Sequence, residues 1–272
     1  MKVFSSIIKF FINIFCLVVK KNRDIKQYVL NVALRNEVID YIENRYYAEY
    51  EHIKRSISIL KSKSIFDNFI ILDIGGSNGK TAIMYSDAFP LNSVYVFEPI
   101  KETFEVLLQN IKNNKNIIAI NKAVGNKDGK EKINVAKRIS ASSLLDLKAD
   151  KSSRLFAENL EKVKTEEITI CKIDKEVPTD SKIGIMKIDV QGFELEVLKG
   201  AELTMQKTFI ILLEVNNHSG YTGSPKYYEI DLKLGESGFF LYDLCPSTRD
   251  SGRLKEWDVI YANKKYYEDW NN

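Results

Sequence analysis

An acidic residue followed by spaced glycines marks the first stretch of the chain that can do chemistry. The segment LDIGGSNGKT places Asp73 at the end of an apolar run, with Gly75 and Gly79 two and six residues further on. A glycine-rich turn between a strand and a helix presents backbone N–H groups to a ligand, and phosphates and adenosine cofactors bind at such turns. The loop therefore indicates a nucleotide-type cofactor, and its spacing must decide which one.

The spacing disfavours the two commonest nucleotide loops. A phosphate-binding loop needs four residues between its first glycine and the Gly-Lys pair, but only three separate Gly75 from Gly79. A dinucleotide loop needs glycine where the chain has Ser77 and Lys80. An acid followed by glycines two, four and six residues on is typical of methyltransferases, and here Asp73 starts that pattern with serine in the middle position. We therefore predict S-adenosylmethionine as the cofactor, with a phosphate loop, a dinucleotide loop or an empty turn as alternatives.

A second carboxylate supports an adenosine cofactor. Glu98 ends the apolar run SVYVFE, which reads as the next strand. A carboxylate at that point can accept hydrogen bonds from both ribose hydroxyls. Because an unpaired buried carboxylate is costly, a ligand partner for Glu98 is expected. Dinucleotide enzymes share this acidic residue, so only the loop spacing separates the two classes.

The surrounding pattern predicts an α/β fold. Apolar runs rich in β-branched residues alternate with amphipathic segments in FIILDI, TAIMYSDAF, SVYVFE, ETFEVLLQNIKN and NIIAIN, which indicates parallel strands with crossover helices. Asp128-Gly129 reads as a turn between two strands, while residues 137–165 carry little pattern. Later segments predict strands at IGIMKIDV and FIILLEV, and helices at GFELEVLKGAELTMQ and residues 227–235. The runs FFLYDL and WDVIYAN, joined by CPSTRDSGRLKE, predict an antiparallel C-terminal edge hairpin on a Rossmann-like, mostly parallel sheet of about seven strands.

Composition excludes several classes of protein. The chain has 40 Lys and Arg against 37 Asp and Glu, and a net charge of +3 does not indicate a nucleic-acid binder. Its three cysteines have no CxxC spacing, and with only two histidines this argues against a zinc or histidine-rich metal centre. Unpaired cysteines fit a reducing compartment, so we expect a cytoplasmic protein.

The N-terminal part is predicted to be a helical extension, residues 1–64, before a methyltransferase domain at residues 65–272. Residues 22–62 carry apolar positions at three- and four-residue spacing without glycine or proline. The apolar run Ile14–Val19 is far shorter than the roughly 20 residues of a spanning helix. Residues 1–20 therefore predict a helix that packs on the protein or in a homodimer, or one that lies at the inner face of a membrane as a peripheral contact.

The stretch KIDVQGFELEVLKGA, Lys187–Ala201, is similar to the FkbM-type family of S-adenosylmethionine-dependent methyltransferases. The segments LDIGGSNGKT, VFEPIKETFEVLLQNI, INKAVGNKDG, ASSLLDL and FIILLEVN support the resemblance in the same order, over residues 68–262. The resemblance implies a Rossmann-like fold and methyl transfer to a hydroxyl, usually of a sugar in a polysaccharide, glycolipid or glycosylated natural product. The family commonly has glutamate where this chain has Gln191, which weakens any role of this position as a base or metal ligand.

The resemblance also implies roles for individual residues. Glu98 would hold the ribose, Asn121 to Ala123 would lie near the adenine, and Asp189 would face both cofactor and acceptor. The segment with Ser142 and Ser143 would close over the cofactor. The full set of cofactor-binding candidates is Asp73, Gly75, Gly76, Ser77, Gly79, Glu98, Asn121, Lys122, Ala123, Ser142, Ser143 and Asp189.

Methyl transfer to an alcohol needs a base, because the hydroxyl is a poor nucleophile at neutral pH. Ligands of such sheets bind at the carboxyl ends of strands, which leaves Asp189, Glu214, Asn216 and His218 as candidates. Histidine titrates near neutral pH, so His218 is a candidate base alongside Asp189, while Glu214 would contact substrate hydroxyls or brace the loop. A divalent ion between Asp189 and Glu214 is an alternative, although no metal site is predicted. A lipid, peptide or small-metabolite acceptor, or a binding domain without catalysis, are the competing functions.

Overall fold

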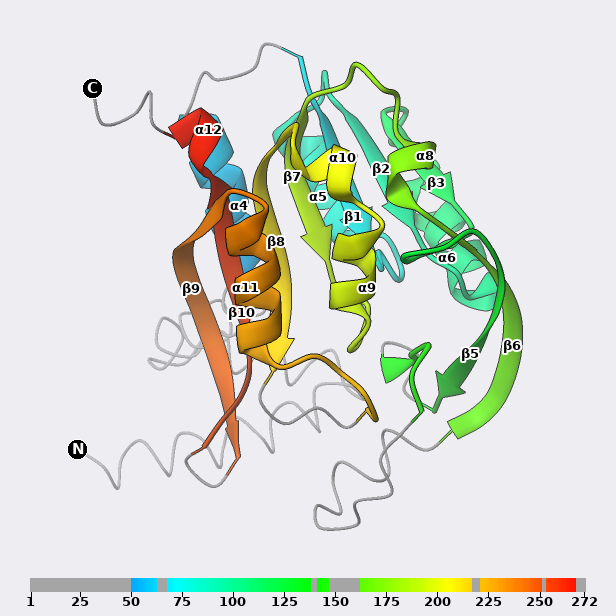
Figure 1. Cartoon of the computed structure of the whole chain (residues 1–272). Coiled ribbons are helices and arrows are strands. Elements are labelled where there is room, and N and C mark those ends of the chain that lie inside the picture. Colours follow the sequence, from blue (N-terminus) through cyan, green and yellow to red (C-terminus); the bar gives the residue numbers. More distant parts are fainter. Residues whose placement is uncertain are drawn as a thin grey trace, which may run out of the picture. The chain divides into compact units, whose positions relative to one another are not determined.

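A seven-stranded sheet organises the part of the chain that the structure describes. The computed structural model describes residues 50–62, 68–137, 141–146, 162–216, 221–250 and 253–267. The strands lie in the order β3-β2-β1-β7-β8-β10-β9 (Figure 1). Their bounds are β1 (Ile70–Ile74), β2 (Ser93–Phe97), β3 (Ile117–Ile120), β7 (Ile183–Ile188), β8 (Thr208–Asn216), β9 (Phe239–Asp250) and β10 (Arg253–Asn263).

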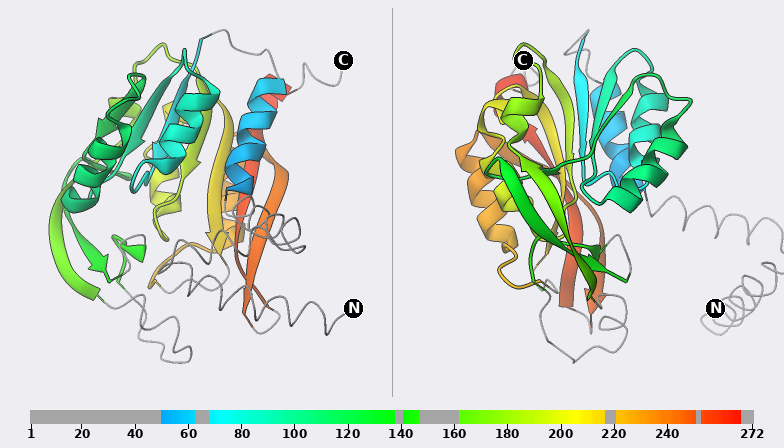
Figure 2. Two further views of the ribbon diagram at one scale, coloured as in Figure 1. Left: turned by 180° about the vertical axis from the view of Figure 1, so that it is seen from behind. Right: turned by 90° about the vertical axis from the view of Figure 1, so that its right-hand side faces the viewer.

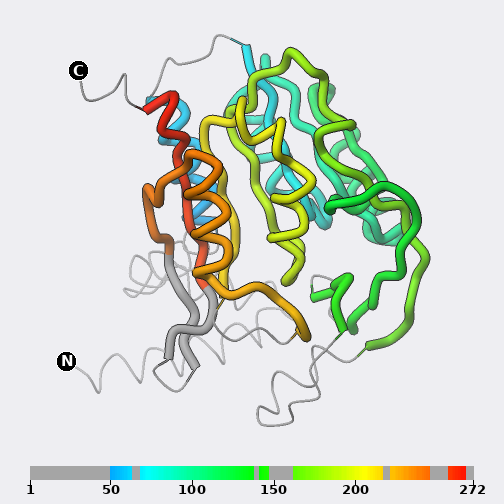
Figure 3. The backbone as a smooth tube through the Cα atoms, viewed as in Figure 1, coloured from blue at the N-terminus to red at the C-terminus, as the bar shows by residue number. Residues whose placement is uncertain are grey.

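The sheet is parallel except at β10, which confirms the predicted fold class. The pairs β1–β2, β2–β3, β1–β7 and β7–β8 are parallel, and β10 is antiparallel to both β8 and β9. The closing hairpin lies at the edge of the sheet as predicted, with β10 between β8 and β9, as the chain trace shows (Figure 3). Every residue of β1 and β7 is buried because helices cover both faces, which explains why these strands read as continuous apolar runs.

Two layers of helices cover the sheet (Figure 2). Leu72, Ile74 and Ile188 belong to one large apolar core between the sheet and one of these two helix layers. The side chains of Asp73 and Lys187 point to the opposite face of the sheet. The first layer contains α4 (Glu51–Ser62), α5 (Lys80–Ala88) and α6 (Lys101–Ile111). The second layer contains α8 (Ile173–Glu176), α9 (Glu194–Lys199), α10 (Glu202–Met205) and α11 (Tyr227–Glu236), and α12 (Lys264–Tyr267) follows the last strand.

A second, three-stranded sheet was not predicted. It contains β4 (Ala123–Val124), β6 (Lys162–Cys171) and β5 (Gly129–Ala136) in the order β4-β6-β5. The predicted turn at Asp128-Gly129 does lie between two strands, but β4 and β5 pair with β6 and not with each other. The first half of β6, KVKTEE, is charged and mostly exposed, so its sequence lacks the alternation that marks a half-buried strand.

Two sequence-based boundaries were wrong. The helix expected over GFELEVLKGAELTMQ is interrupted at Gly200, where a Cβ would lie 1.9 Å from the carbonyl oxygen of Gly125. The close approach of these two backbones separates α9 from α10. The closing strands are also longer than predicted, because β9 and β10 continue through most of the CPSTRDSGRLKE segment.

The described part of the N-terminal region is α4. Its residues 51–62 confirm the end of the predicted helical stretch 22–62, and Ile53 and Leu60 are buried. Burying each of these side chains contributes about 1.5–3 kcal/mol. Residues 1–49 and 63–67 lie outside the described part, so the predicted boundary at residue 64 and the predicted contacts of residues 1–20 stay predictions. No helix within the described ranges is long and apolar enough to cross a membrane.

Candidate active site

The loop after β1 depends on glycine at two positions. Gly75 and Gly79 have φ angles of 80° and 83°, a conformation that glycine adopts without steric cost. A Cβ on Gly75 would lie 1.9 Å from the carbonyl oxygen of Asp189, so no larger residue fits between β1 and β7. The N–H groups of Gly75 and Gly76 both donate to the Phe97 carbonyl at 3.0 Å, which holds the loop against β2.

Glu98 lies directly after β2 and is bound by the same loop. Its Oε2 accepts a hydrogen bond from the N–H of Ser77 at 3.1 Å, and its Oε1 accepts one from the N–H of Ile100 at 2.9 Å. Burial raises the pKa of the Glu98 carboxyl to about 7, and the two backbone donors oppose that rise. The carboxyl is therefore poised to change its protonation state when a ligand adds or removes hydrogen-bond donors.

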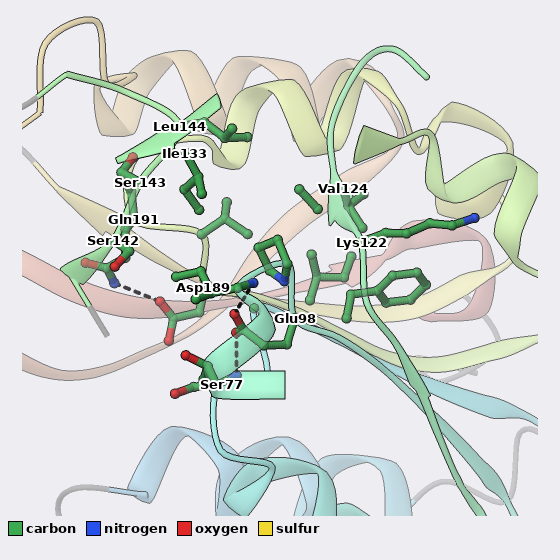
Figure 4. A pocket seen from close by; sticks show the side chains of 18 residues that line it. Ser77, Glu98, Lys122, Val124, Ile133, Ser142, Ser143, Leu144, Asp189 and Gln191 are labelled. Atoms are coloured by element: carbon green, nitrogen blue, oxygen red, sulfur yellow. Dashed lines mark hydrogen bonds between the residues drawn. The ribbon is translucent and has the colours of Figure 1, made fainter. Parts of the chain in front are cut away.

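These groups face one pocket at the carboxyl ends of β1, β2 and β7 (Figure 4). The pocket is partly open to solvent, and polar and apolar side chains both line it. Apolar side chains from both sheets supply one wall, including Phe97, Ile133 and Leu144. Such a wall suits a flat heterocycle, while the polar groups at Ser77 and Glu98 suit a sugar.

Eight of the predicted cofactor residues line this pocket, namely Gly75, Ser77, Glu98, Lys122, Ala123, Ser142, Ser143 and Asp189. Asp73, Gly76, Gly79 and Asn121 are not among the residues that line it. Asn121 Nδ2 donates to the carbonyl oxygens of Glu98 at 2.8 Å and Pro99 at 3.1 Å, and so fixes the backbone that carries Glu98. Lys122 lines the pocket, but its Nζ points away and pairs with Glu176 at 2.7 Å (Figure 4).

A buried ion pair lies beneath the pocket floor. Lys187 Nζ is 3.2 Å from Asp73 Oδ1 and 3.5 Å from Asp189 Oδ2, and both Lys187 and Asp73 are almost completely buried. Burial works against the charge of Lys187, but the neighbouring carboxylates outweigh it and raise its pKa, so the ammonium stays charged. Burial raises the pKa of the Asp73 carboxyl, and the Lys187 ammonium opposes that rise. The pair joins β1 to β7 and delivers a positive charge to Asp189.

Asp189 and Glu214 are brought together by a residue that the sequence analysis had discounted. Gln191 Nε2 donates to Asp189 Oδ1 at 2.9 Å and to Glu214 Oε2 at 3.3 Å. The third predicted catalytic residue, His218, lies outside the described residues. No group of three or more His, Cys, Asp or Glu side chains in the described part is arranged to hold a metal ion.

Several pocket residues were missed by the sequence analysis. Ile133 comes from β5 of the second sheet, which was not predicted, and Leu144 follows Ser143 in the segment expected to close over the cofactor, but neither residue was named. Thr103 and Ile100 lie at the start of α6, where their side chains reach the same pocket as Glu98. Their position directly after the strand that carries Glu98 is the one signal in the sequence that could have found them.

The residues present fit an adenosine cofactor. A carboxylate offers about four lone-pair positions, and the backbone of Ser77 and Ile100 uses two of those on Glu98. The two that remain match the two hydroxyl donors of a ribose. Because Gly75 has no Cβ, the backbone of Asp189 lies directly against it, and both residues line the pocket.

The fold and this pocket define a class I methyltransferase: a parallel Rossmann-like sheet with one antiparallel strand near its edge and an adenosine site after β1 and β2. A family model described as the methyltransferase FkbM domain matches residues 73–241, more than half of the chain. The chain therefore belongs to the FkbM methyltransferase family, and its cofactor is S-adenosylmethionine.

Three proteins to which the chain is similar share little sequence identity with it. Methyltransferase 1 of Beauveria bassiana (strain ARSEF 2860) is 22% identical over 169 residues, covering 57% of this chain and 68% of the relative. The magnesium protoporphyrin IX methyltransferase of Synechocystis PCC 6803, with bound SAM, gives a TM-score of 0.46 at 10% identity, covering 79% of this chain and 80% of that one. A putative tRNA (m1A22) methyltransferase of Streptococcus pneumoniae, in complex with S-adenosyl-L-methionine, gives 0.45 at 10%, covering 78% and 72%.

The protonation of Glu98 should make nucleoside binding depend on pH. Only the ionised carboxylate can accept from both ribose hydroxyls, and its pKa in the free protein is about 7. Adenosine, which has no group that titrates near neutrality, should bind about tenfold more weakly at pH 6 than at pH 8. Calorimetric titration at both pH values measures this, with Glu98→Gln as the control that binds weakly and without pH dependence. Equal affinity of the unchanged protein at both values would contradict the assignment of Glu98 to the ribose.

Proposed function

We propose that the chain is an O-methyltransferase that transfers a methyl group from S-adenosylmethionine to a hydroxyl of a carbohydrate. The observation that carries this proposal is the position of Asp189. Its carboxylate lines the cofactor pocket, lies 3.5 Å from the Lys187 ammonium and accepts a hydrogen bond from Gln191. A carboxylate held in this way beside the cofactor is suited to remove a proton from an acceptor.

The cofactor carries the difficult chemistry and the protein aligns the acceptor. S-adenosylmethionine, held at Glu98 and the loop after β1, would supply an activated methyl group, and the electron pair of its carbon–sulfur bond would stay on sulfur as the methyl group passed to the acceptor oxygen. Asp189 accepts the proton that the acceptor hydroxyl loses. Glu214, joined to Asp189 through Gln191, accepts a hydrogen bond from a neighbouring hydroxyl of the acceptor.

Carbohydrates match this arrangement because adjacent hydroxyl groups can occupy two carboxylates at once. His218 follows β8 by two residues and remains the alternative base. A lipid, peptide or small metabolite as acceptor, or a binding role without turnover, are the competing proposals.

An acceptor screen tests this function. Purified protein with isotopically labelled S-adenosylmethionine is incubated with methyl glycosides of neutral sugars, with hydroxylated fatty acids and with serine-containing peptides. We expect label in the glycosides, in a form that resists mild alkali, because methyl ethers are stable where methyl esters hydrolyse. Label confined to the lipids or peptides would move the acceptor to that class. Binding of the cofactor with no transfer to any acceptor would favour a binding domain and overturn the proposal.

A further inference from the structure

Gln191 lies in a backbone conformation that its residue type rarely adopts. Its φ angle is 55°, and apart from Ser77 in the cofactor loop it is the one non-glycine residue with positive φ in the described part of the chain. Residues held in this region cluster at functional sites, where the surrounding structure fixes them. Glycine would adopt this φ angle without strain, so the presence of glutamine indicates that its side chain has a role here.

Both hydrogens of the Gln191 amide point at carboxylates. One contact reaches Asp189 Oδ1 at 2.9 Å and the other reaches Glu214 Oε2 at 3.3 Å (Figure 4 shows the first). An amide nitrogen has two hydrogens to donate, so these contacts use its whole capacity. The amide thus holds two like charges beside each other and fixes the direction in which each carboxylate faces.

The other polar atoms of Gln191 contact the wall of the cofactor pocket. Its main-chain oxygen accepts a hydrogen bond from Ser143 Oγ at 2.8 Å, and Ser143 lines that pocket. Its Oε1 lies 3.5 Å from the hydroxyl of Tyr221, which also donates to the carbonyl oxygen of Ala141. One residue therefore touches the segment over the cofactor and both carboxylates of the acceptor side.

The turn that carries Gln191 is held from below. Glu194 Oε1 accepts hydrogen bonds from the N–H groups of Val190 at 3.3 Å and Gly192 at 3.0 Å, the two residues that flank Gln191. Glu194 is buried, so these two hydrogen bonds are shielded from water. The backbone is fixed by Glu194, and the Gln191 side chain is left to act on its neighbours.

We propose that Gln191 is a positioning residue for methyl transfer: it orients the carboxylate of Asp189 for proton removal and links that orientation to the closed wall of the cofactor pocket. The inference rests on the proposed function, and it adds a reason for an amide at this position. A glutamate would have no hydrogen to donate to either carboxylate and would place a third negative charge between them.

Three variants of the full chain test the role of the amide. Gln191→Glu keeps the shape and removes the donors, Gln191→Gly removes the side chain and suits the positive φ, and Gln109→Glu makes the same charge change at an exposed position on α6. The measurements are kcat, KM for S-adenosylmethionine and thermal midpoint, with the glycoside that the unchanged protein methylates best. We expect kcat to fall about 10²-fold in both Gln191 variants, as for a reacting group displaced by about 1 Å.

The pattern across measurements separates positioning from folding. KM for S-adenosylmethionine and the midpoint of Gln191→Gly should stay near those of the unchanged protein, and Gln109→Glu should match it throughout. Unchanged kcat in either Gln191 variant, or a loss of kcat matched by a loss of midpoint in both, would overturn the role of Gln191. No methylation by the unchanged protein would instead remove the proposed function, so the two failures are distinguishable.

Discussion

Replacing Asp189 by asparagine should lower kcat by about 10²- to 10⁴-fold, the usual contribution of a positioned general base. The amide is nearly the same size as the carboxylate but cannot take up a proton at neutral pH. Binding of S-adenosylmethionine should change little, because we expect Glu98 and the glycine loop to supply most of the polar contacts to that cofactor. Single-turnover methylation of a glycoside, with calorimetry of cofactor binding, measures the two quantities separately.

The matched control is Asp87→Asn, since Asp87 is exposed on α5 and lies away from the pocket lining. It should keep full activity. A variant at Asp189 that retains kcat would transfer the role of base to another group, and His218 would then be the first residue to replace.

Replacing Lys187 by methionine should cost about 3–5 kcal/mol of unfolding free energy, because it leaves Asp73 buried without its partner. For a domain of this size, that loss corresponds to a fall of roughly 10 °C in the thermal midpoint. The double variant Asp73→Leu with Lys187→Met should recover most of the loss, since removing both charges also removes the cost of burying them. It should not recover activity, because Asp189 still lacks the ammonium beside it.

Calorimetric unfolding of the two single variants and the double variant checks this expectation. The control is Lys130→Met, which breaks a surface ion pair with Glu167 and should leave the midpoint nearly unchanged. A double variant no more stable than Lys187→Met would show that the site depends on the charges themselves and would contradict the argument.

The cofactor half of the site could be predicted because it depends on neighbours in the chain. The spacing of Asp73, Gly75 and Gly79 follows from one strand-to-helix turn, and Glu98 is the first residue after the next strand. Chain-local geometry of this kind leaves a pattern in the sequence. The same pattern does not reveal which way a side chain points, and Asp73 faces Lys187 beneath the floor while Glu98 faces the pocket.

The link between Asp189 and Glu214 through Gln191 could not be predicted, because it depends on contacts between distant segments. Gln191 acquires its role from Ser143, Glu214 and Tyr221, which lie 48, 23 and 30 residues away along the chain. The sequence analysis found only that position 191 lacks the glutamate that the family commonly has there. The second sheet was missed for a related physical reason: β6 carries charged residues on both faces over its first half, so burial left no periodic signal to detect.

While the protein is being synthesised, β8 keeps an open edge until β10 has left the ribosome. β10, residues 253–263, fills the place between β8 and β9, so β9 has no neighbour in the sheet before β10 arrives. The ion pairs Arg55–Asp243 and His52–Asp258 likewise join α4 to the last two strands. An uncovered edge can pair with other chains. A nascent chain that stalls before residue 253 would therefore carry a finished cofactor loop and an unprotected sheet.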